Sequence, residues 1–167
     1  LLEENYIKII ELKTGALFAA ATRVGACISC MDKKKRDALE SYGKNLGLAF
    51  QIADDALDYF SMEKIFGKQI GKDFFEGKVT LPIIILFQKA NTIERTFLEN
   101  IFKKEVREKK DLDDTLKLIK KYNTVETTFK RAEYFVSVSY DALGIFEDSE
   151  EKRVLQNLTS FSLNRSF

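Results

Sequence analysis

The sequence predicts a single all-α domain spanning residues 1–167, and three observations support this class. Its 8 glycines and 1 proline supply too few turn residues for an all-β domain. Apolar residues recur at steps of three or four along most of the chain, as they do in amphipathic helices. The length of 167 residues and the hydrophobic content of 45% are enough for one domain with a substantial core.

The first helices follow from this periodicity. We expect one long helix over residues 5–30, and neighbouring elements should bury residues 16–26, which are small and apolar almost all round. Asp32 is placed to cap a second helix, over about 33–60. Beside its apolar stripe this helix has a second stripe of residues, first small, then polar and finally acidic, and we interpret this stripe as facing a ligand. The members of that stripe are Gly43, Gly47, Gln51, Asp54 and Asp58.

Residues 61–80 break the helical pattern with glycines and lysines, and we expect a loop with a short helical turn. Thr80 is placed to cap the next helix, which has Pro82 in its first turn, where a missing N–H costs nothing. Further helices are expected over 92–108, 111–122, 124–143 and 148–161. The sequence opens in a helical pattern without a starting methionine, so we expect it to be part of a longer chain.

The composition excludes several classes of protein. The 27 basic and 26 acidic residues give a net charge of +1, which provides no overall field to attract nucleic acid. Histidine is absent, so histidine triads and histidine metal sites are excluded. Cys27 and Cys30 have no second pair to complete a zinc site, and we interpret them as packed thiols of a reducing compartment, the cytoplasm. No apolar run is long enough for a transmembrane segment, and no signal peptide is visible.

Three aspartates gather near the end of the second helix: Asp54, Asp55 and Asp58. Asp54 and Asp58 lie one helical turn apart on the same face, where like charges repel by roughly 0.2–0.5 kcal/mol per pair. Folding alone gives no reason for this cluster, whereas Mg²⁺ takes one or two carboxylates and completes its shell with water and phosphate oxygens. The alternative is a solvated acidic face, which neighbours such as Phe50 and Ile52 disfavour because they leave little of the helix to face water.

Lysines near these aspartates fit a diphosphate bound through the metal. The loop after the aspartates carries Lys68 and Lys78, whose ammonium groups can neutralise the phosphate charge that a metal leaves. We interpret Lys64 and Lys72 in the same loop as solvated. Lys13 lies within an apolar helix and requires either an anionic partner, such as a phosphate, or a stem that reaches water.

Four motifs stand in a fixed order along the chain. They are Lys13-Thr14; Phe50-Gln51 followed by Asp54-Asp55-Ala56-Leu57-Asp58; Gly67-Lys68 with Gly71-Lys72-Asp73; and Glu76-Gly77-Lys78-Val79-Thr80-Leu81-Pro82. Together they resemble the trans-isoprenyl diphosphate synthases, the polyprenyl synthetase family, whose second aspartate-rich motif is similar to the aspartates here. The resemblance covers residues 5 to about 90 and is closest to bacterial long-chain members of the octaprenyl type.

The resemblance implies an all-α bundle of the isoprenoid synthase type, of which this chain is the C-terminal portion, and a homodimer. It implies a Mg²⁺-dependent prenyltransferase that condenses isopentenyl diphosphate with an allylic diphosphate to make a trans-polyprenyl diphosphate, octaprenyl-like and of the kind used in quinone side chains. Peripheral membrane contact by an enzyme with a lipid product stays open. The implied catalytic residues are Asp54, Asp55, Asp58 and Lys68, the three aspartates being the metal ligands and Asp54 the most direct one. The implied diphosphate-binding residues are Lys13, Thr14, Gln51, Lys68 and Lys78.

One departure from the family pattern is large. Neither the first aspartate-rich motif nor the upstream residues that bind isopentenyl diphosphate occur in these 167 residues, so we expect this chain alone to be inactive. Three alternatives stay open: a terpene synthase, disfavoured by the EGKVTLP segment; a non-catalytic partner subunit, disfavoured by the intact aspartates; and a helical interaction module without chemistry.

Overall fold

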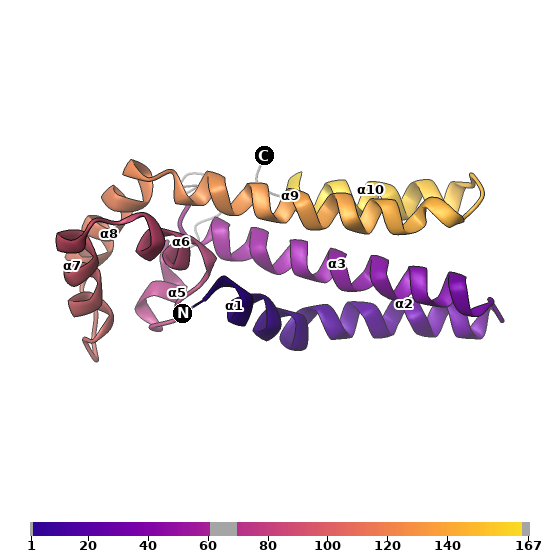
Figure 1. Ribbon diagram of the computed structural model, residues 1–167, viewed down its shortest axis with the longest axis horizontal. Helices are drawn as coiled ribbons and strands as arrows, with labels where there is room; N and C mark the ends of the chain where they lie inside the picture. Colours follow the sequence, from indigo (N-terminus) through magenta and orange to yellow (C-terminus); the bar gives the residue numbers. More distant parts are fainter. Residues whose placement is uncertain (1, 61–69, 165–167) are drawn as a thin grey trace. The chain divides into compact units, whose positions relative to one another are not determined.

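The computed structural model describes residues 2–60 and 70–164, and every regular element within those ranges is a helix, which confirms the all-α class (Figure 1). The elements are α1 (Glu3–Ile10), η1 (Glu11–Gly15), α2 (Ala16–Ile28), α3 (Lys33–Leu57), α5 (Lys72–Phe75), α6 (Leu81–Lys89), α7 (Thr92–Phe102), α8 (Lys109–Lys121), α9 (Thr124–Ala142), η2 (Leu143–Ile145) and α10 (Glu150–Asn164).

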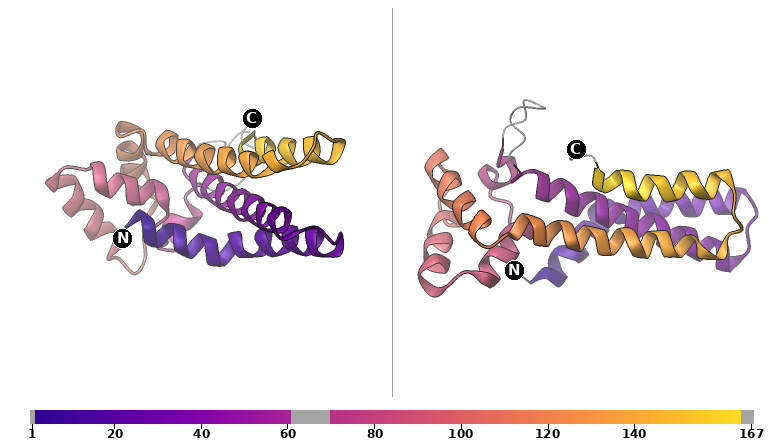
Figure 2. Two further views of the ribbon diagram at one scale, coloured as in Figure 1. Left: turned by 45° about the vertical axis from the view of Figure 1, so that its right-hand side comes forward. Right: turned by 90° about the horizontal axis from the view of Figure 1, so that it is seen from above.

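The helices belong to two compact units. The first unit comprises residues 1–6 and 54–129, and the second comprises residues 7–53 and 130–167. In the second unit α2, α3, α9 and α10 run lengthwise alongside one another (Figures 1 and 2). The buried side chains between them are Ala26, Leu39, Tyr42, Leu46 and Leu143.

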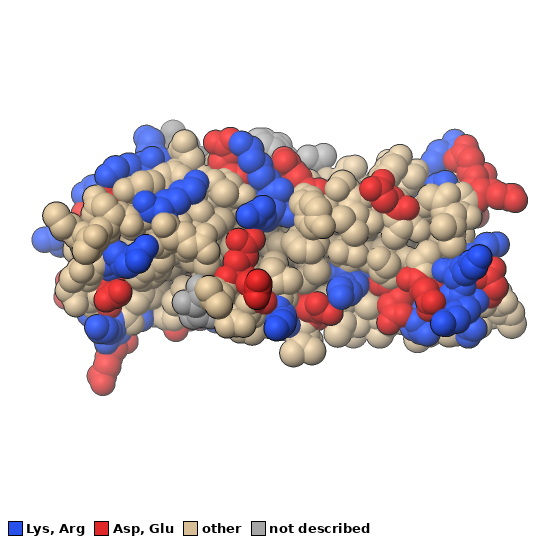
Figure 3. Space-filling view, in the orientation of Figure 1, with Lys and Arg blue, Asp and Glu red and all other residues tan. Residues whose placement is uncertain are grey.

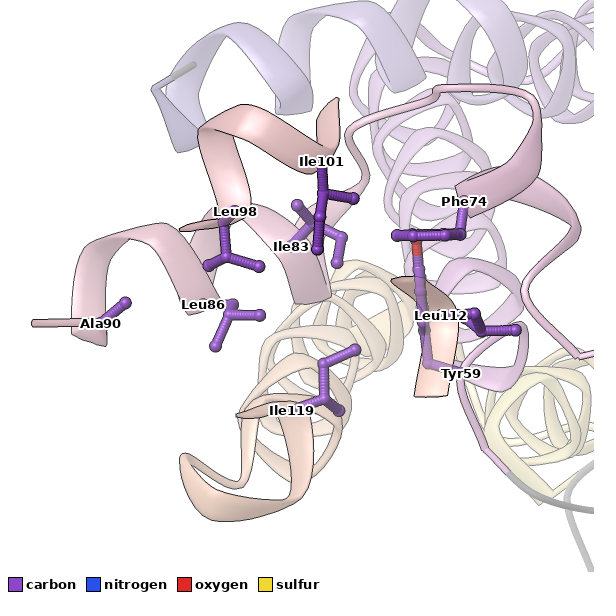
Figure 4. Close-up of a cluster of buried hydrophobic side chains, with 9 residues drawn as sticks. All are labelled: Tyr59, Phe74, Ile83, Leu86, Ala90, Leu98, Ile101, Leu112 and Ile119. Atoms are coloured by element: carbon purple, nitrogen blue, oxygen red, sulfur yellow. The ribbon is translucent and has the colours of Figure 1, made fainter. Parts of the chain in front are cut away.

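The first unit has its own apolar core, built by α6, α7 and α8 together with residues flanking α3 and within α5 (Figure 4). Helix α6 begins with Pro82 in its first turn, as predicted. The backbone of Thr80 caps it by accepting N–H groups from Ile83 and Ile84, both at 3.0 Å, although its hydroxyl makes no capping bond among the described residues. The buried members of this core are Tyr59, Phe74, Ile83, Leu86, Ala90, Leu98, Ile101, Leu112 and Ile119.

Helix α3 begins where the sequence predicts. The Oδ1 atom of Asp32 accepts a hydrogen bond from the Lys35 N–H at 3.0 Å, so this side chain caps the first turn. The expected ligand-facing role is wrong for Gly43 and Gly47, because Gly43 lies against α2 and Gly47 lies against η1 and α2. A Cβ atom added at Gly43 would sit 2.3 Å from the Thr22 hydroxyl oxygen, and one added at Gly47 would sit 2.9 Å from the Gly15 Cα. Close approach of two helices explains these glycines.

The first predicted helix departs from expectation in two ways. Its α-helical ladder is interrupted by one π-helical segment, η1, a feature that hydrophobic periodicity does not reveal. The expected burial of α2 is wrong for the described residues, because only Ala19 and Ala26 are buried in it, while Leu17 is 71% exposed. The packed-thiol interpretation is wrong too, since Cys27 and Cys30 are exposed near the end of α2.

Acidic and basic side chains are interspersed over the face shown in Figure 3, which agrees with the net charge of +1. A search of the described helices finds none with both the length and the apolar content that a membrane crossing requires.

Candidate active site

The three aspartates lie at the C-terminal end of α3 and just beyond it, in the first unit. Asp54 and Asp55 belong to the last turn of the helix, and Asp58 follows Leu57 directly. Asp55 is 4% and Asp58 9% exposed, whereas Asp54 is half-buried. The solvated acidic face that we disfavoured is therefore absent at two of the three positions.

Asp58 is fixed by the backbone of the segment that leads into α5. Its Oδ1 accepts the Lys72 N–H at 3.1 Å and its Oδ2 accepts the Asp73 N–H at 2.9 Å. The Asp58 carbonyl oxygen also accepts the Gly71 N–H at 2.8 Å. The side chain thus caps a short helix, and two backbone donors fix the position of a buried carboxylate.

Gly71 makes this arrangement possible. Its φ of +78° is one that residues with a side chain rarely adopt, and an added Cβ would lie 2.7 Å from the Leu112 Cδ1 atom. Leu112 belongs to the buried core of the first unit, so its side chain has little room to move away. The chain reverses tightly enough to reach Asp58 because this position is glycine.

Asp55 is fixed by a side chain instead. The Tyr6 hydroxyl, on α1 in the same unit, donates a hydrogen bond to Asp55 Oδ2 at 2.8 Å. Burial and the negative charge of Asp55 raise the pKa of Tyr6 well above its ordinary value, so the hydroxyl stays protonated and remains a donor. The sequence does not predict the role of Tyr6, because a single tyrosine on an apolar helix face is typical of a core residue.

Asp54 differs from both neighbours. Among residues 2–60 and 70–164, no donor or cation forms a hydrogen bond or ion pair with its carboxylate. In the same part of the chain no three acidic or thiol side chains gather closely enough to enclose a metal ion. A single half-exposed carboxylate fits Mg²⁺, which keeps several waters and takes further oxygens from phosphate.

The residues expected to bind a diphosphate fall into separate settings. In the second unit, the Thr14 hydroxyl donates to Gln51 Oε1 at 2.8 Å, so the structure pairs two of them. Thr14 and the exposed Lys13 both lie in η1, and π-helical turns occur frequently at functional sites. Lys68 lies outside the described residues.

Lys78 has two acidic partners of its own in the first unit. Its ammonium group lies 2.5 Å from Glu76 Oε2 and 3.1 Å from Asp73 Oδ1. These contacts raise the pKa of Lys78, the hydrogen bond to Glu76 contributing most. The side chain is half exposed, so the pairing is open to exchange with a solvent-borne anion.

Known proteins match this chain over nearly its whole length. The sequence pattern of the polyprenyl synthetase family matches residues 1–119. An octaprenyl diphosphate synthase from Haemophilus influenzae is 30% identical over 165 residues, which are 99% of this chain and 50% of that protein. A short chain isoprenyl diphosphate synthase from Methanothermobacter thermautotrophicus is 34% identical over 98% of this chain and 50% of its own length.

Solved structures agree with the sequence matches. A polyprenyl synthase from Caulobacter crescentus, complexed with calcium and isoprenyl diphosphate, has a TM-score of 0.92 and 36% identity, and the match covers 99% of this chain and 50% of that one. A decaprenyl diphosphate synthase from Rhodobacter capsulatus has a TM-score of 0.91 and 35% identity over 99% of this chain and 51% of its own. The chain therefore spans about half the length of the relatives it matches.

Proposed function

Because the chain belongs to the polyprenyl synthetase family, we propose that it carries half of the active site of a prenyltransferase. The reaction is the condensation of isopentenyl diphosphate with an allylic diphosphate, giving a trans-polyprenyl diphosphate. The relatives are named for products from short-chain to decaprenyl, and we propose a long-chain, octaprenyl-like product of the kind found in quinone side chains. The setting we propose is a homodimer in the cytoplasm.

One observation carries the proposal: the half-buried Asp54 directly precedes two buried carboxylates that are already hydrogen-bonded. Asp54 would hold Mg²⁺ directly, and Asp55 and Asp58 would act on it through water. Bound Mg²⁺ supplies charge neutralisation for a diphosphate leaving group. Hydrogen-bond donors hold the Asp55 and Asp58 carboxylates in place, close to Asp54 along the chain.

The diphosphate itself would be held by hydroxyl, amide and ammonium groups of this chain. Thr14 and Gln51 are already oriented toward each other by their hydrogen bond, so they present polar atoms in a fixed arrangement. We propose Lys13, Lys68 and Lys78 as the cations, with Lys78 exchanging its acidic partners for phosphate oxygens.

We further propose that turnover requires a second half of the fold. The exposed apolar side chains of α1, η1 and α2 support this, because isolated soluble surfaces rarely present so many together. Leu12 is 80%, Leu17 71% and Ile28 78% exposed. The relatives are about twice as long as this chain, so they contain polypeptide of sufficient length to cover such a face.

Isothermal titration with farnesyl thiodiphosphate, an unreactive allylic analogue, tests the half-site. We expect the 167-residue chain to bind it only when Mg²⁺ is present and to catalyse no prenyl transfer alone. Asp54→Asn should abolish the Mg²⁺-dependent part of the binding, because the carboxylate that meets the metal is lost. Asp113→Asn, at an exposed acidic position in α8, is the matched control and should bind as the wild type does.

Three results would contradict the proposal. Binding that is equally strong without Mg²⁺ would show that the site holds the diphosphate without a metal ion. Loss of binding in Asp113→Asn as well as in Asp54→Asn would indicate a general effect of charge rather than a site. A chain that folds but binds no allylic diphosphate would favour the non-catalytic subunit.

A further inference from the structure

The contact between Tyr6 and Asp55 joins residues 49 positions apart within the first unit. Both side chains are 4% exposed, and the hydroxyl-to-carboxylate distance is 2.8 Å. Burying a carboxylate without a hydrogen-bond donor costs free energy, so the Tyr6 hydroxyl reduces the cost of burying Asp55 near the end of α3.

The position of Asp55 gives this contact a consequence for its neighbour. Asp54 and Asp55 are adjacent in the last turn of α3, so their Cα atoms are about 3.8 Å apart. Successive residues of an α-helix point about 100° apart, so the two carboxylates diverge from a shared stretch of backbone. A shift of the Asp55 carboxylate changes its distance from a cation held by Asp54, and with that distance their electrostatic energy.

We propose that Tyr6 is a positioning residue for the metal site: it fixes the Asp55 carboxylate so that its charge supports a divalent cation held by Asp54. This inference rests on the proposed function. Tyr6 is buried, so it acts through Asp55 and does not itself meet substrate. Removing a hydrogen-bonding partner of a metal ligand typically lowers metal affinity by about 10–100-fold, and Tyr6 lies one step further from the metal, behind Asp55, so we expect the lower end of this range.

The contrast with Asp58 sharpens the assignment. Asp58 is held by the backbone N–H groups of Lys72 and Asp73, which no side-chain substitution removes. The hydroxyl donor to Asp55 is a side-chain group, so a single atom change at Tyr6 deletes it. Position 6 is therefore a place where the acidic turn can be altered without touching any of its three aspartates.

Tyr6→Phe is the variant that tests the role, because it keeps the buried ring and removes only the hydroxyl. The matched control is Tyr42→Phe: Tyr42 is 1% exposed, and its hydroxyl donates to the Leu155 carbonyl oxygen at 2.9 Å, within the second unit. Both variants remove one hydrogen bond of a buried tyrosine. Only Tyr6→Phe should weaken metal binding.

The measurement is the affinity of the 167-residue chain for Mn²⁺ in the presence of farnesyl thiodiphosphate, by isothermal titration or by the electron paramagnetic resonance signal of free Mn²⁺. We expect an affinity loss on the order of tenfold for Tyr6→Phe and an unchanged affinity for Tyr42→Phe. In the Asp55→Asn background, Tyr6→Phe should cause no further loss, because the charge that it positions is gone. Tyr6→4-aminophenylalanine keeps a donor at the same place and should restore affinity to within about twofold of the wild type.

The outcomes separate the two proposals. If the wild type binds Mn²⁺ with the analogue and folded Tyr6→Phe binds it equally well, the positioning role is wrong while the proposed function stands. An equal loss in the Asp55→Asn background would also refute it. If Tyr6→Phe does not fold, a tenfold loss in Tyr6→4-aminophenylalanine overturns the role. If the wild type itself binds no Mn²⁺ with the analogue, the proposed function fails and the positioning role falls with it.

Discussion

Replacement of Gly71 by alanine tests how the acidic turn is held. The backbone φ of +78° at this residue costs roughly 1–2 kcal/mol for a residue with a Cβ. The new methyl group would meet the Cδ1 and Cδ2 atoms of Leu112 at 2.7 and 2.8 Å, and overpacking of a core costs about 1–3 kcal/mol. Gly71→Ala should therefore lower the free energy of unfolding by about 2–5 kcal/mol.

Urea unfolding followed by circular dichroism measures this loss. Gly25→Ala is the matched control, because no atom lies within 4 Å of a Cβ added at Gly25 in helix α2. Alanine replaces glycine in the interior of a helix there and should raise the stability by about 0.5–1 kcal/mol. If Gly71→Ala unfolds at the same urea concentration as the wild type, neither the backbone strain nor the contact with Leu112 is as described.

Two further substitutions test packing and charge. Gly43→Ala should lower the free energy of unfolding in urea by about 1–3 kcal/mol, because the new methyl group would lie 2.4 Å from the Phe18 carbonyl oxygen. An unfolding midpoint equal to that of the wild type would contradict the close approach of α2 and α3. The hydrogen bonds from Lys121 and then Tyr122 lower the pKa of Glu94 from 4.5 to about 2, so the stability they give is present above pH 4.5 and is lost as the pH falls through about 2. Glu94→Gln should consequently lower the melting temperature at pH 7, with a difference from the wild type that shrinks between pH 4.5 and 2; a difference of the same size at both ends would refute this reading.

The sequence was sufficient for features that depend on local chemistry. Asp32 caps α3 and Pro82 opens α6 as predicted, because a cap or a proline acts on residues only a few positions away. Most helix positions were predictable for the same reason, although ends shifted; the helix expected over 92–108 ends at Phe102. Local rules carry information over about one turn, and these features need no more.

Features that depend on distant segments were not predictable from periodicity. Periodicity places Gly43 and Gly47 on a ligand-facing stripe, but a glycine that allows another helix to approach has the same spacing as one that allows a substrate to approach. The π-helical segment η1 inserts a residue into a helix whose apolar spacing on either side is ordinary. The exposure of α2 was missed because an apolar helix predicts burial without identifying the element that covers it.

The three aspartates of the candidate site also combine a feature set by the local sequence with features set by distant segments. The motif alone placed Asp54, Asp55 and Asp58 together, since spacing on one helix is a local property. Their different surroundings come from Tyr6, 49 residues away, and from backbone amides 14 and 15 residues away. Identical side chains thus become two fixed carboxylates and one with no fixed donor among the described residues.

That difference follows from what a buried charge requires. Each carboxylate in the protein interior needs hydrogen-bond donors. Asp58 accepts backbone N–H groups that a tight turn brings within reach, and Asp55 accepts the Tyr6 hydroxyl. A carboxylate that serves a metal must keep lone pairs available, so it cannot be satisfied in the same manner. The residue left half-buried at the end of α3 is accordingly the one whose replacement should affect the cation most and the fold least, and Asp54→Asn should bind no Mg²⁺-dependent diphosphate while unfolding in urea as the wild type does.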